Sequence, residues 1–402
     1  MPKFVDGQYI TVRLRLEPTE EQLVLLEERT ALYTSLLNSC MEIAIKQPRA
    51  ISRNSTKLHH ASYRTLRELY PQLPAADIIT ARNKVVEVLK ARDTRIYRLE
   101  KRIQWLEEHQ RKARPKLQKQ LERLRAVMPH FKSATVPLPY SNGYRLWREK
   151  REVSLTTYVR MRVRMQYTAS EYVRAQLDSS LAFKEAKLCY DHKKHRWYLY
   201  VAILQKCPQK RSGAPLGVDQ GVVNLVTTDD GYKVLGDAVW KRVERYQNLR
   251  SRLQSAADNG SRSARRHLKQ SSGRLRRYTN DTCHCIAKEV VRYACALGKG
   301  SIALERIKGL ESKSMSKCMR KLIGQWPHAQ LTKYITYKAR LAGLDVVFVS
   351  PAYTSTTCSI CGYHEPLARV TRDIFRCPQC GDLDADVNAA KNIALRAMQK
   401  AM

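Results

Sequence analysis

The chain has 402 residues, 43% of them hydrophobic, and 73 lysines and arginines against 37 aspartates and glutamates, a net charge of +36. This hydrophobic content excludes a disordered basic tail and is sufficient for several folded units. No segment approaches the roughly 18 apolar residues of a membrane span, and no signal peptide opens the chain, so we expect an intracellular protein without a membrane segment.

The positive charge is spread along the whole chain. A folded protein this basic repels itself unless a polyanion neutralises it, and each phosphate contact also releases counterions. The expected partner is therefore a nucleic acid. A basic protein bound at a membrane surface is the alternative.

The first predicted elements are a strand and a helix. Residues 9–16, "YITVRLRL", alternate with period two, which is typical of a strand. Thr19 and Gln22 have the spacing of a capping box, which predicts a helix beginning directly after Thr19. The apolar face of this helix carries Leu23, Leu26, Tyr33 and Leu37.

Residues 75–127 are helical in pattern and heavily charged. Apolar residues recur every three or four positions on both sides of Pro115, which predicts two antiparallel helices packed along two seams. The seam residues are Ile96, Leu99, Ile103 and Leu106, then Leu117, Leu121, Leu124 and Val127. The basic outer faces fit either a solvated hairpin or a nucleic-acid platform.

Residues 135–205 are rich in strand-like runs. In "VRMRVRM" the residues Arg160, Arg162 and Arg164 would share one face of a strand. The turn "DHKKHRW" contains His192 and His195, which we interpret as polar turn residues and not as metal ligands. Residues 208–215, "PQKRSGAP", have the composition of a linker.

Three short apolar strands are expected in the second half, at residues 215–219, 301–305 and 344–349. A further strand follows the glycine turn after Asp219. The basic segment 259–278 predicts either a surface excursion or a helical arm near phosphates.

Four of the eleven cysteines, Cys358, Cys361, Cys377 and Cys380, follow the pattern C-x2-C-x15-C-x2-C. This spacing indicates a zinc ribbon with one structural Zn²⁺, because four thiolates close the coordination shell. Gly362 and Gly381 allow each turn to continue beyond its second cysteine. A redox CxxC is the alternative, which two pairs at ribbon spacing disfavour.

The other seven cysteines are scattered, and we expect them to be packing residues in a reducing compartment. They are Cys40, Cys189, Cys207, Cys283, Cys285, Cys295 and Cys318. The "CHC" at 283–285 lies in a helical pattern, where adjacent residues do not face each other, so it is a weak metal candidate.

Three carboxylates form a second candidate site: Asp219, Glu305 and Asp386. Singly, they could be a turn residue, a surface charge and an N-cap, and Asp384 could also be the N-cap. In the order Asp, Glu, Asp on strand, strand and helix, they fit a ribonuclease-H-like sheet. Such carboxylates hold two Mg²⁺ or Mn²⁺ ions about 4 Å apart that activate water against a phosphodiester.

Several segments together resemble TnpB, the transposon-encoded ancestor of type V CRISPR effectors. They are "LGVDQGVVNLVTT", "ALERIKGL", "YKARLAGLDVVFVSPAYTSTTCSICG" and "CPQCGDLDADVNAAKNIA", and the start "YITVRLRLEPTEEQLVLLEE" is also similar. The resemblance implies an RNA-guided DNA endonuclease in the cytoplasm of a prokaryotic cell, acting at the nucleoid. Its partners would be a guide RNA and a target DNA that carries a short flanking motif, and its catalytic residues would be Asp219, Glu305 and Asp386.

The implied fold is α/β and multidomain: a RuvC domain with an inserted zinc ribbon, and a wedge β-barrel with an inserted helical recognition lobe. The expected parts are a wedge strand at 1–18, the helical lobe at 19–130, the wedge barrel at 131–210, the nuclease at 211–354, the ribbon at 355–381 and the last nuclease helix at 382–402.

Other functions remain compatible with the sequence. One is a nuclease-inactive RNA-guided repressor, although all three carboxylates are present. Another is a RuvC-like resolvase or a transposase that needs no guide, and a third is a zinc-ribbon binding module without catalysis. A monomer and a homodimer both fit, as do guides from a transposon end and from a CRISPR array.

Overall fold

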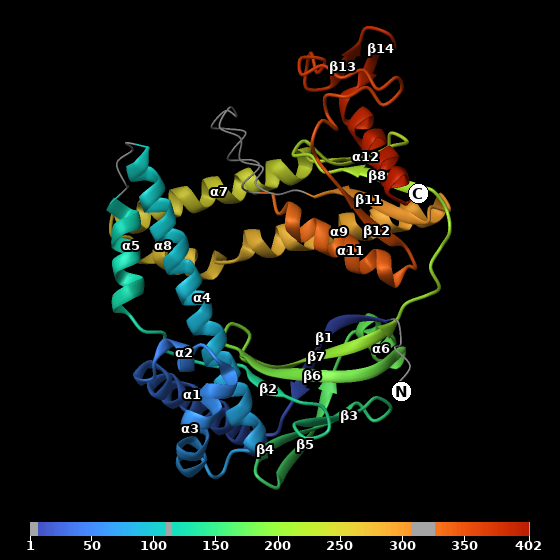
Figure 1. Ribbon diagram of the computed structural model, residues 1–402. Helices are drawn as coiled ribbons and strands as arrows, with labels where there is room; N and C mark the ends of the chain where they lie inside the picture. The colour runs from blue at the N-terminus through green and yellow to red at the C-terminus, as the bar shows by residue number, and fades with distance from the viewer. Residues whose placement is uncertain (1–6, 110–114, 307–325, 402) are drawn as a thin grey trace. The chain divides into compact units, whose positions relative to one another are not determined.

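The computed structural model describes residues 7–109, 115–306 and 326–401. These residues form two compact units, Tyr9–Gln205 and Lys206 onward, and the division falls just before the expected linker. Both units combine helices and sheets, so the chain has the expected α/β character (Figure 1). No described helix has the length and apolar character needed to cross a membrane.

The first unit contains a seven-stranded sheet in the order β2-β6-β7-β1-β5-β4-β3. A bridge between Tyr140 and Tyr144 brings its two edges together, so the sheet is a nearly closed barrel. Its strands are β1 (Gly7–Glu17), β2 (Val136–Leu138), β3 (Tyr144–Trp147), β4 (Glu152–Tyr158), β5 (Met161–Thr168), β6 (Ser180–Asp191) and β7 (Arg196–Lys206), with α6 (Glu171–Asp178) before β6.

Helix α1 (Glu20–Lys46) begins as its sequence predicts. The Thr19 hydroxyl accepts a hydrogen bond from the Gln22 amide, and the Gln22 side chain accepts one from the Thr19 amide, which completes the capping box. Its apolar face packs into the same core as the sheet, together with α3 (Ser55–Leu69), and the short helix α2 (Arg49–Ser52) contacts α1 and α3.

The predicted helical hairpin is confirmed as α4 (Ala75–Glu108) and α5 (Pro115–Ala126). The Arg92 guanidinium donates to the carbonyls of Leu124 and Arg125, each at 3.0 Å. Ile103 is buried against this partner helix, as expected for the seam. The prediction for Val127 is wrong: the helix ends one residue earlier, and Val127 is 60% exposed.

The prediction that the three arginines of "VRMRVRM" share one strand face is only partly correct. Arg160 lies in the turn before β5 with φ of +61°, so it does not share the strand face. Arg162 is bonded to the Ser154 hydroxyl and the Asn142 carbonyl, both at 3.0 Å, and Arg164 lies 4.5 Å from the centre of the Trp147 ring. Both guanidinium groups therefore already stabilise the barrel.

The second unit is built on a five-stranded sheet in the order β10-β9-β8-β11-β12. Strands β8, β11 and β12 are parallel, whereas β9 and β10 run antiparallel to their neighbours. This confirms the four strands predicted in the second half, β8 (Pro215–Asp219), β9 (Asn224–Thr228), β11 (Ser301–Glu305) and β12 (Asp345–Val349). Strand β10 (Lys233–Leu235) was not predicted.

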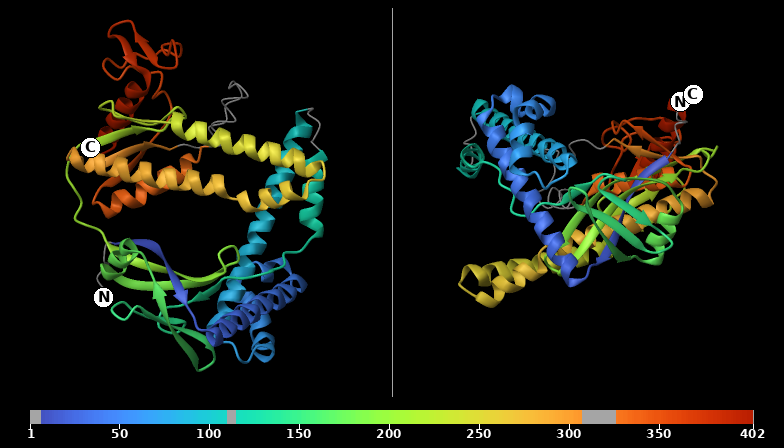
Figure 2. Two further views of the ribbon diagram at one scale, coloured as in Figure 1. Left: turned by 180° about the vertical axis from the view of Figure 1, so that it is seen from behind. Right: turned by 90° about the horizontal axis from the view of Figure 1, so that it is seen from below.

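Among the residues that the structure describes, five helices accompany the sheet: α7 (Asp237–Asp258), α8 (Arg262–Ser271), α9 (Arg274–Ala296), α11 (His328–Leu341) and α12 (Ala385–Ala401). The basic segment 259–278 forms α8 and the first turn of α9, so it is part of a helical arm, the second of the two expected forms. In this arm α7 and α9 run side by side (Figures 1 and 2). Helices α9 and α11 also pack against each other over the sheet.

Gly217 lets the last helix, α12, lie directly on β8. A Cβ atom at Gly217 would come 2.0 Å from the Ala390 carbonyl oxygen and 2.9 Å from the Ala394 side chain. The Ala390 carbonyl oxygen belongs to the helix backbone, so it cannot move away without shifting the helix. Glycine is thus required here for close packing and not for an unusual φ.

Substituting Gly217→Ala is expected to lower the free energy of unfolding by about 3 kcal/mol, because overpacking must push α12 off the sheet. Urea unfolding followed by circular dichroism measures this. The control is Gly260→Ala, where a Cβ has open space and meets only the penalty of φ at +95°, about 1 kcal/mol. An equal loss in both variants would contradict the packing argument.

His328, the first residue of α11, is a buried histidine with an unusual pKa. It is 7% exposed, and neither ring nitrogen has a hydrogen-bond partner among the described residues. Burial lowers its pKa to about 4. An unfolded histidine titrates near 6.5, so between pH 6.5 and 4 the unfolded chain binds a proton that the folded chain does not.

The free energy of unfolding should therefore fall as pH decreases from 6.5 toward 4, by up to about 3 kcal/mol from this residue. His328→Leu should remove that part of the pH dependence. Urea unfolding of both proteins at several pH values tests it, and parallel curves for the two proteins would show that His328 does not cause the loss.

Candidate functional site

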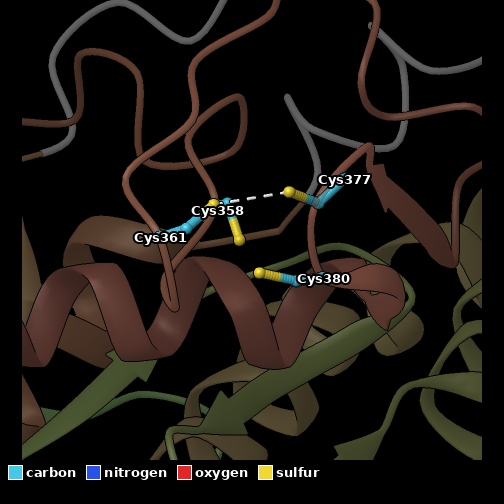
Figure 3. Close-up of side chains that lie close together, drawn as sticks. All are labelled: Cys358, Cys361, Cys377 and Cys380. Carbon is cyan, nitrogen blue, oxygen red and sulfur yellow. Dashed lines mark hydrogen bonds between the residues drawn. The ribbon is translucent and has the colours of Figure 1, made fainter.

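The four cysteines predicted to bind zinc lie together. The sulfur atoms of Cys358, Cys361, Cys377 and Cys380 are all within 4.8 Å of one another (Figure 3). Gly362 and Gly381 both have φ of +78°, which explains why glycine follows the second cysteine of each pair. Four convergent thiols form a soft donor set of the kind that suits zinc.

The cysteine cluster is a small subdomain with little core of its own. Strands β13 (Ile374–Cys377) and β14 (Gly381–Asp384) pair antiparallel, and Phe375 is fully buried beside the cysteines. Its small core contains only three other buried residues besides Cys358 and Phe375. A core this small is typical of subdomains that a bound metal cross-links.

Two asparagines of α12 form hydrogen bonds with the chain segment that leads into the first cysteine pair. Asn388 donates to the Thr357 carbonyl and accepts from the Ser359 amide, both at 2.8 Å, and Asn392 donates to the Thr354 carbonyl at 2.9 Å. Both asparagines are buried. The sequence analysis did not single them out, although two asparagines four residues apart on an alanine-rich helix share one face.

The three predicted carboxylates meet at one edge of the sheet. Asp219 and Glu305 are the last residues of β8 and β11, and the preceding residues of these parallel strands are direct partners. The carboxyl ends of parallel strands lie at the same edge. Asp386 is in the first turn of α12, the helix that packs on β8.

The charges of Glu305 and Asp386 affect the ionisation of Asp219. Burial, together with the charges of Glu305 and Asp386, raises the pKa of Asp219 to about 7, while Arg369 opposes this rise. Burial also raises the pKa of Glu305, although the Thr354 hydroxyl donates to its carboxylate at 2.5 Å. These carboxylates therefore repel one another at neutral pH.

The carboxylates are less tightly grouped than the cysteines. In the described part of the chain, only the cysteines form a set of three or more such ligand atoms all within 4.8 Å. The weaker candidates are not part of any such set either. Cys283 is buried and Cys285 exposed in α9, and His195 faces the Tyr190 hydroxyl, while Cys318 lies outside the described residues.

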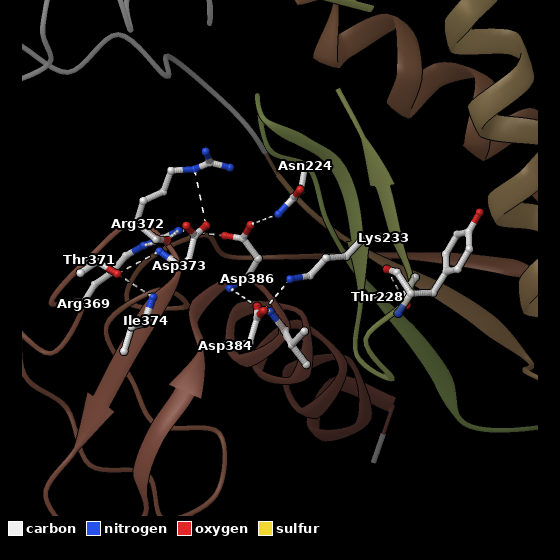
Figure 4. A network of polar contacts seen from close by, with 12 residues as sticks. Asn224, Thr228, Lys233, Arg369, Thr371, Arg372, Asp373, Ile374, Asp384 and Asp386 are labelled. Atoms are coloured by element: carbon white, nitrogen blue, oxygen red, sulfur yellow. Dashed lines mark hydrogen bonds and ion pairs between the residues drawn. The ribbon is translucent and has the colours of Figure 1, made fainter. Parts of the chain in front are cut away.

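Asp384 and Asp386 have different roles (Figure 4). One oxygen of Asp384 accepts from the amides of Asp386 and Val387, at 3.1 and 3.0 Å, so Asp384 is the N-cap of α12. Its other oxygen pairs with Lys233 at 2.5 Å. Burial acts to raise the pKa of Asp384, but the bonds from Lys233 and the helix amides lower it.

Asp386 does not cap the helix, and two other side chains orient its carboxylate. Asn224 of β9 donates to one carboxylate oxygen at 2.8 Å, and Arg369 contacts the other at 2.8 Å. Arg369 lies between the two cysteine pairs, so the cysteine subdomain contacts the acidic site directly. Neither residue was found by sequence reasoning, because Arg369 is one of 73 basic residues.

Comparison with known proteins points to one family. Residues 328–393 match the family model of the Cas12f1-like TNB domain. The CRISPR-associated endodeoxyribonuclease Cas12f1 of Syntrophomonas palmitatica is 23% identical over 85% of this chain and 76% of its own length. The Cas12f1 of Sulfoacidibacillus thermotolerans is 28% identical, and the match covers 54% of each protein.

The TnpB side of the family is also represented. TnpB-like protein MJ0751 of Methanocaldococcus jannaschii is 29% identical over 43% of this chain and 60% of its own length. The chain is thus similar both to Cas12f1 endodeoxyribonucleases and to a TnpB-like protein.

Two solved structures have a fold similar to that of this chain. The chain in a Cas12f1–sgRNA–target DNA complex aligns with a TM-score of 0.52 and 14% identity, covering 97% of this chain and 99% of that one. CasPhi-2 (Cas12j) bound to crRNA gives 0.51 and 11% identity, with 97% and 98% coverage. The similarity in fold therefore extends over the first half of the chain as well as the second.

Proposed function

We propose that this protein is an RNA-guided DNA endonuclease that hydrolyses target DNA in a RuvC, ribonuclease-H-like domain. The observation that carries this proposal is the convergence of Asp219, Glu305 and Asp386 from β8, β11 and α12 within each other's electrostatic field. The names of the relatives, which are endodeoxyribonucleases and TnpB-like proteins, support it.

The donor set of this site suits Mg²⁺ or Mn²⁺, because carboxylate oxygens are hard ligands. Two such ions, when bound, activate water and stabilise the leaving oxygen of a phosphodiester. Asp219, whose pKa lies near 7, would become fully ionised on binding a divalent cation. Asn224 and Arg369 hold the Asp386 carboxylate in one orientation, and Thr354 does the same for Glu305.

Two divalent ions would share these three carboxylates. The three oxygens do not all fall within 4.8 Å, the closeness found for the four cysteines. A two-ion arrangement, with ions about 4 Å apart, spans a wider acidic site.

The cysteine cluster is proposed to hold one structural Zn²⁺. Four thiolates leave no open position for substrate, so the ion would stabilise the ribbon and take no part in hydrolysis. Through Arg369 and the two asparagines of α12, the ribbon would keep the Asp386 helix in place.

Guide RNA and target DNA are the proposed partners, and the described surface offers basic sites for them. An open pocket between α2 and α4 is lined by Arg49, Arg53, Lys90 and Tyr97. Asp93 pairs with both arginines there, at 3.2 and 2.9 Å, and holds them in fixed orientations. Such a pocket presents cations to phosphate and an aromatic face to a base.

The domain organisation is proposed on the same basis. Strand β1 and residues 131–210 would be the wedge, residues 19–130 the recognition lobe, and residues from 211 onward the nuclease with its ribbon at 355–381. The continuous core shared by β1, the helices α1, α3 and α4 and the barrel strands agrees with a lobe inserted into the wedge.

The decisive experiment compares RNA-free protein with guide-loaded protein in Mg²⁺, using a plasmid that carries the matching target beside a randomised flanking sequence. We expect site-specific cutting with guide RNA only, because net charge alone gives binding without sequence preference. Equal site-specific cutting in both tubes would favour the resolvase reading. Guided binding without any cutting would favour the nuclease-inactive repressor.

A further inference from the structure

Tyr353 has a backbone conformation that a large side chain rarely adopts. Its φ is +64°, in the left-handed region, where a bulky residue is a true outlier. The side chain is also 65% exposed, so burial in a core does not compensate for the strain. Strain of this kind persists only where the surrounding structure imposes it, and it concentrates at functional sites.

The structure imposes this conformation from both sides. Before Tyr353, the Arg396 guanidinium donates to the carbonyls of Ser350 and Ala352, at 2.9 and 2.5 Å. After it, the buried Asn392 side chain donates to the Thr354 carbonyl at 2.9 Å. All three bonds come from α12, so the helix that carries Asp386 also fixes the Tyr353 backbone.

Tyr353 is adjacent to the acidic site. The next residue, Thr354, donates its hydroxyl to the Glu305 carboxylate at 2.5 Å. Consecutive Cα atoms are about 3.8 Å apart, so the Tyr353 backbone is within one residue of a direct contact to a proposed catalytic group.

Tyr353 also has an aromatic partner from the ribbon. Its ring lies 4.9 Å from the His364 ring at 88°, an edge-to-face contact. His364 is bridged to Thr357, across the first cysteine pair. The edge-to-face contact fixes the orientation of the phenol ring and leaves much of its surface to solvent.

We propose that Tyr353 is a positioning residue whose ring stacks on an unpaired base of the DNA strand held at the acidic site. This inference rests on the proposed function. Proteins that bind single strands combine a basic surface with aromatic rings on which bases stack, because every base has a π face. A rigid, exposed ring beside an acidic site in a protein of net charge +36 meets that description.

The backbone conformation at position 353 would not by itself require tyrosine, since glycine adopts φ near +60° without strain. The ring is therefore the part of the residue that needs a function. A base is the occupant that fits, because the neighbouring carboxylates would hold the backbone of the same strand through their metal ions.

The test measures kcat and KM for single-stranded target DNA with guide-loaded protein in Mg²⁺. Tyr353→Gly removes the ring without a backbone penalty, and we expect KM to rise about tenfold or more while the melting temperature stays equal or increases. Tyr353→Phe and Tyr353→Trp should keep KM within about threefold of the unsubstituted protein, because both retain an aromatic face. The control is Leu367→Ala, at an 81% exposed ribbon residue, which should change neither constant.

A second measurement separates this inference from the proposed function. Asp219→Ala protein, with and without Tyr353→Gly, is mixed with a single strand carrying 2-aminopurine, whose fluorescence is quenched by stacking. We expect quenching that the glycine variant loses. If the unsubstituted protein cuts DNA but Tyr353→Gly leaves both KM and quenching unchanged, the stacking role is wrong. If the unsubstituted protein does not cut but quenching depends on Tyr353, the proposed nuclease fails and the base-stacking role stands.

A purely structural tyrosine would give the opposite pattern. Tyr353→Gly would then lower the melting temperature and kcat together, and Tyr353→Trp would fail to restore either. That result would overturn the proposal.

Discussion

Replacing Asp219, Glu305 or Asp386 by alanine, one at a time, is expected to abolish DNA cleavage, with a loss of roughly a thousandfold or more. The reason is that each carboxylate belongs to one cluster, so removing one disturbs the geometry for both proposed ions. Binding of nucleic acid should stay nearly unchanged, because it depends on dispersed basic residues. Cleavage rates and filter binding, measured side by side, check both parts.

The matched control is Asp384→Asn, two residues from Asp386. Asparagine is an equally good N-cap, so α12 keeps its start and loses only the pairing with Lys233. Cleavage should persist in this variant and fail in Asp386→Asn. The reverse outcome, with Asp384 essential and Asp386 dispensable, would overturn the assignment of the catalytic aspartate.

Cys377→Ser is expected to remove zinc from the ribbon and to impair cutting. A structural zinc site contributes on the order of 10 kcal/mol to folding, and the small core around Phe375 cannot replace that contribution. The ribbon should become sensitive to protease, and cutting should fall because Arg369 no longer holds Asp386. Elemental analysis should show one zinc per unsubstituted chain and almost none in the variant.

The control for this prediction is Cys285→Ser, an exposed cysteine of α9 outside the cluster. It should retain one zinc per chain and full activity. An unsubstituted protein that contains no zinc after purification without chelator would contradict the zinc assignment itself.

Local signals explain which elements could be predicted. The start of α1 was correct because Thr19 and Gln22 form a capping box through contacts three residues apart. The parallel strands of the second unit were recognisable as short apolar runs, which are typical of strands buried on both faces. The cysteine cluster was predictable because each pair folds locally into one turn.

The incorrect details concern the ends of elements and the use of charges. Val127 continued the apolar spacing, but spacing cannot show that the helix ends at Ala126. Alternation placed Arg160 on the strand, yet its φ of +61° puts it in the preceding turn. Arg162 looked available to phosphate, but it bonds to the barrel through contacts 8 and 20 residues away.

The candidate acidic site required more than local pattern. Its three carboxylates were proposed from their order and from resemblance to a family. Their approach to one another depends on the pairing of β8 with β11 and on the fit of α12 over Gly217. Asn224 and Arg369, which contact Asp386, are separated from it by 162 and 17 positions in the sequence. No sequence pattern predicts contacts of this kind.

The position of α12 in the chain has a consequence for synthesis in the cell. Asp386, the two asparagines that hold the ribbon approach, and the surface that covers Gly217 all belong to residues 385–401. A ribosome makes these residues after both other carboxylates. A growing chain therefore cannot assemble the acidic site until this helix has emerged, and truncated translation products that stop before it should be harmless to the genome of the cell that makes them.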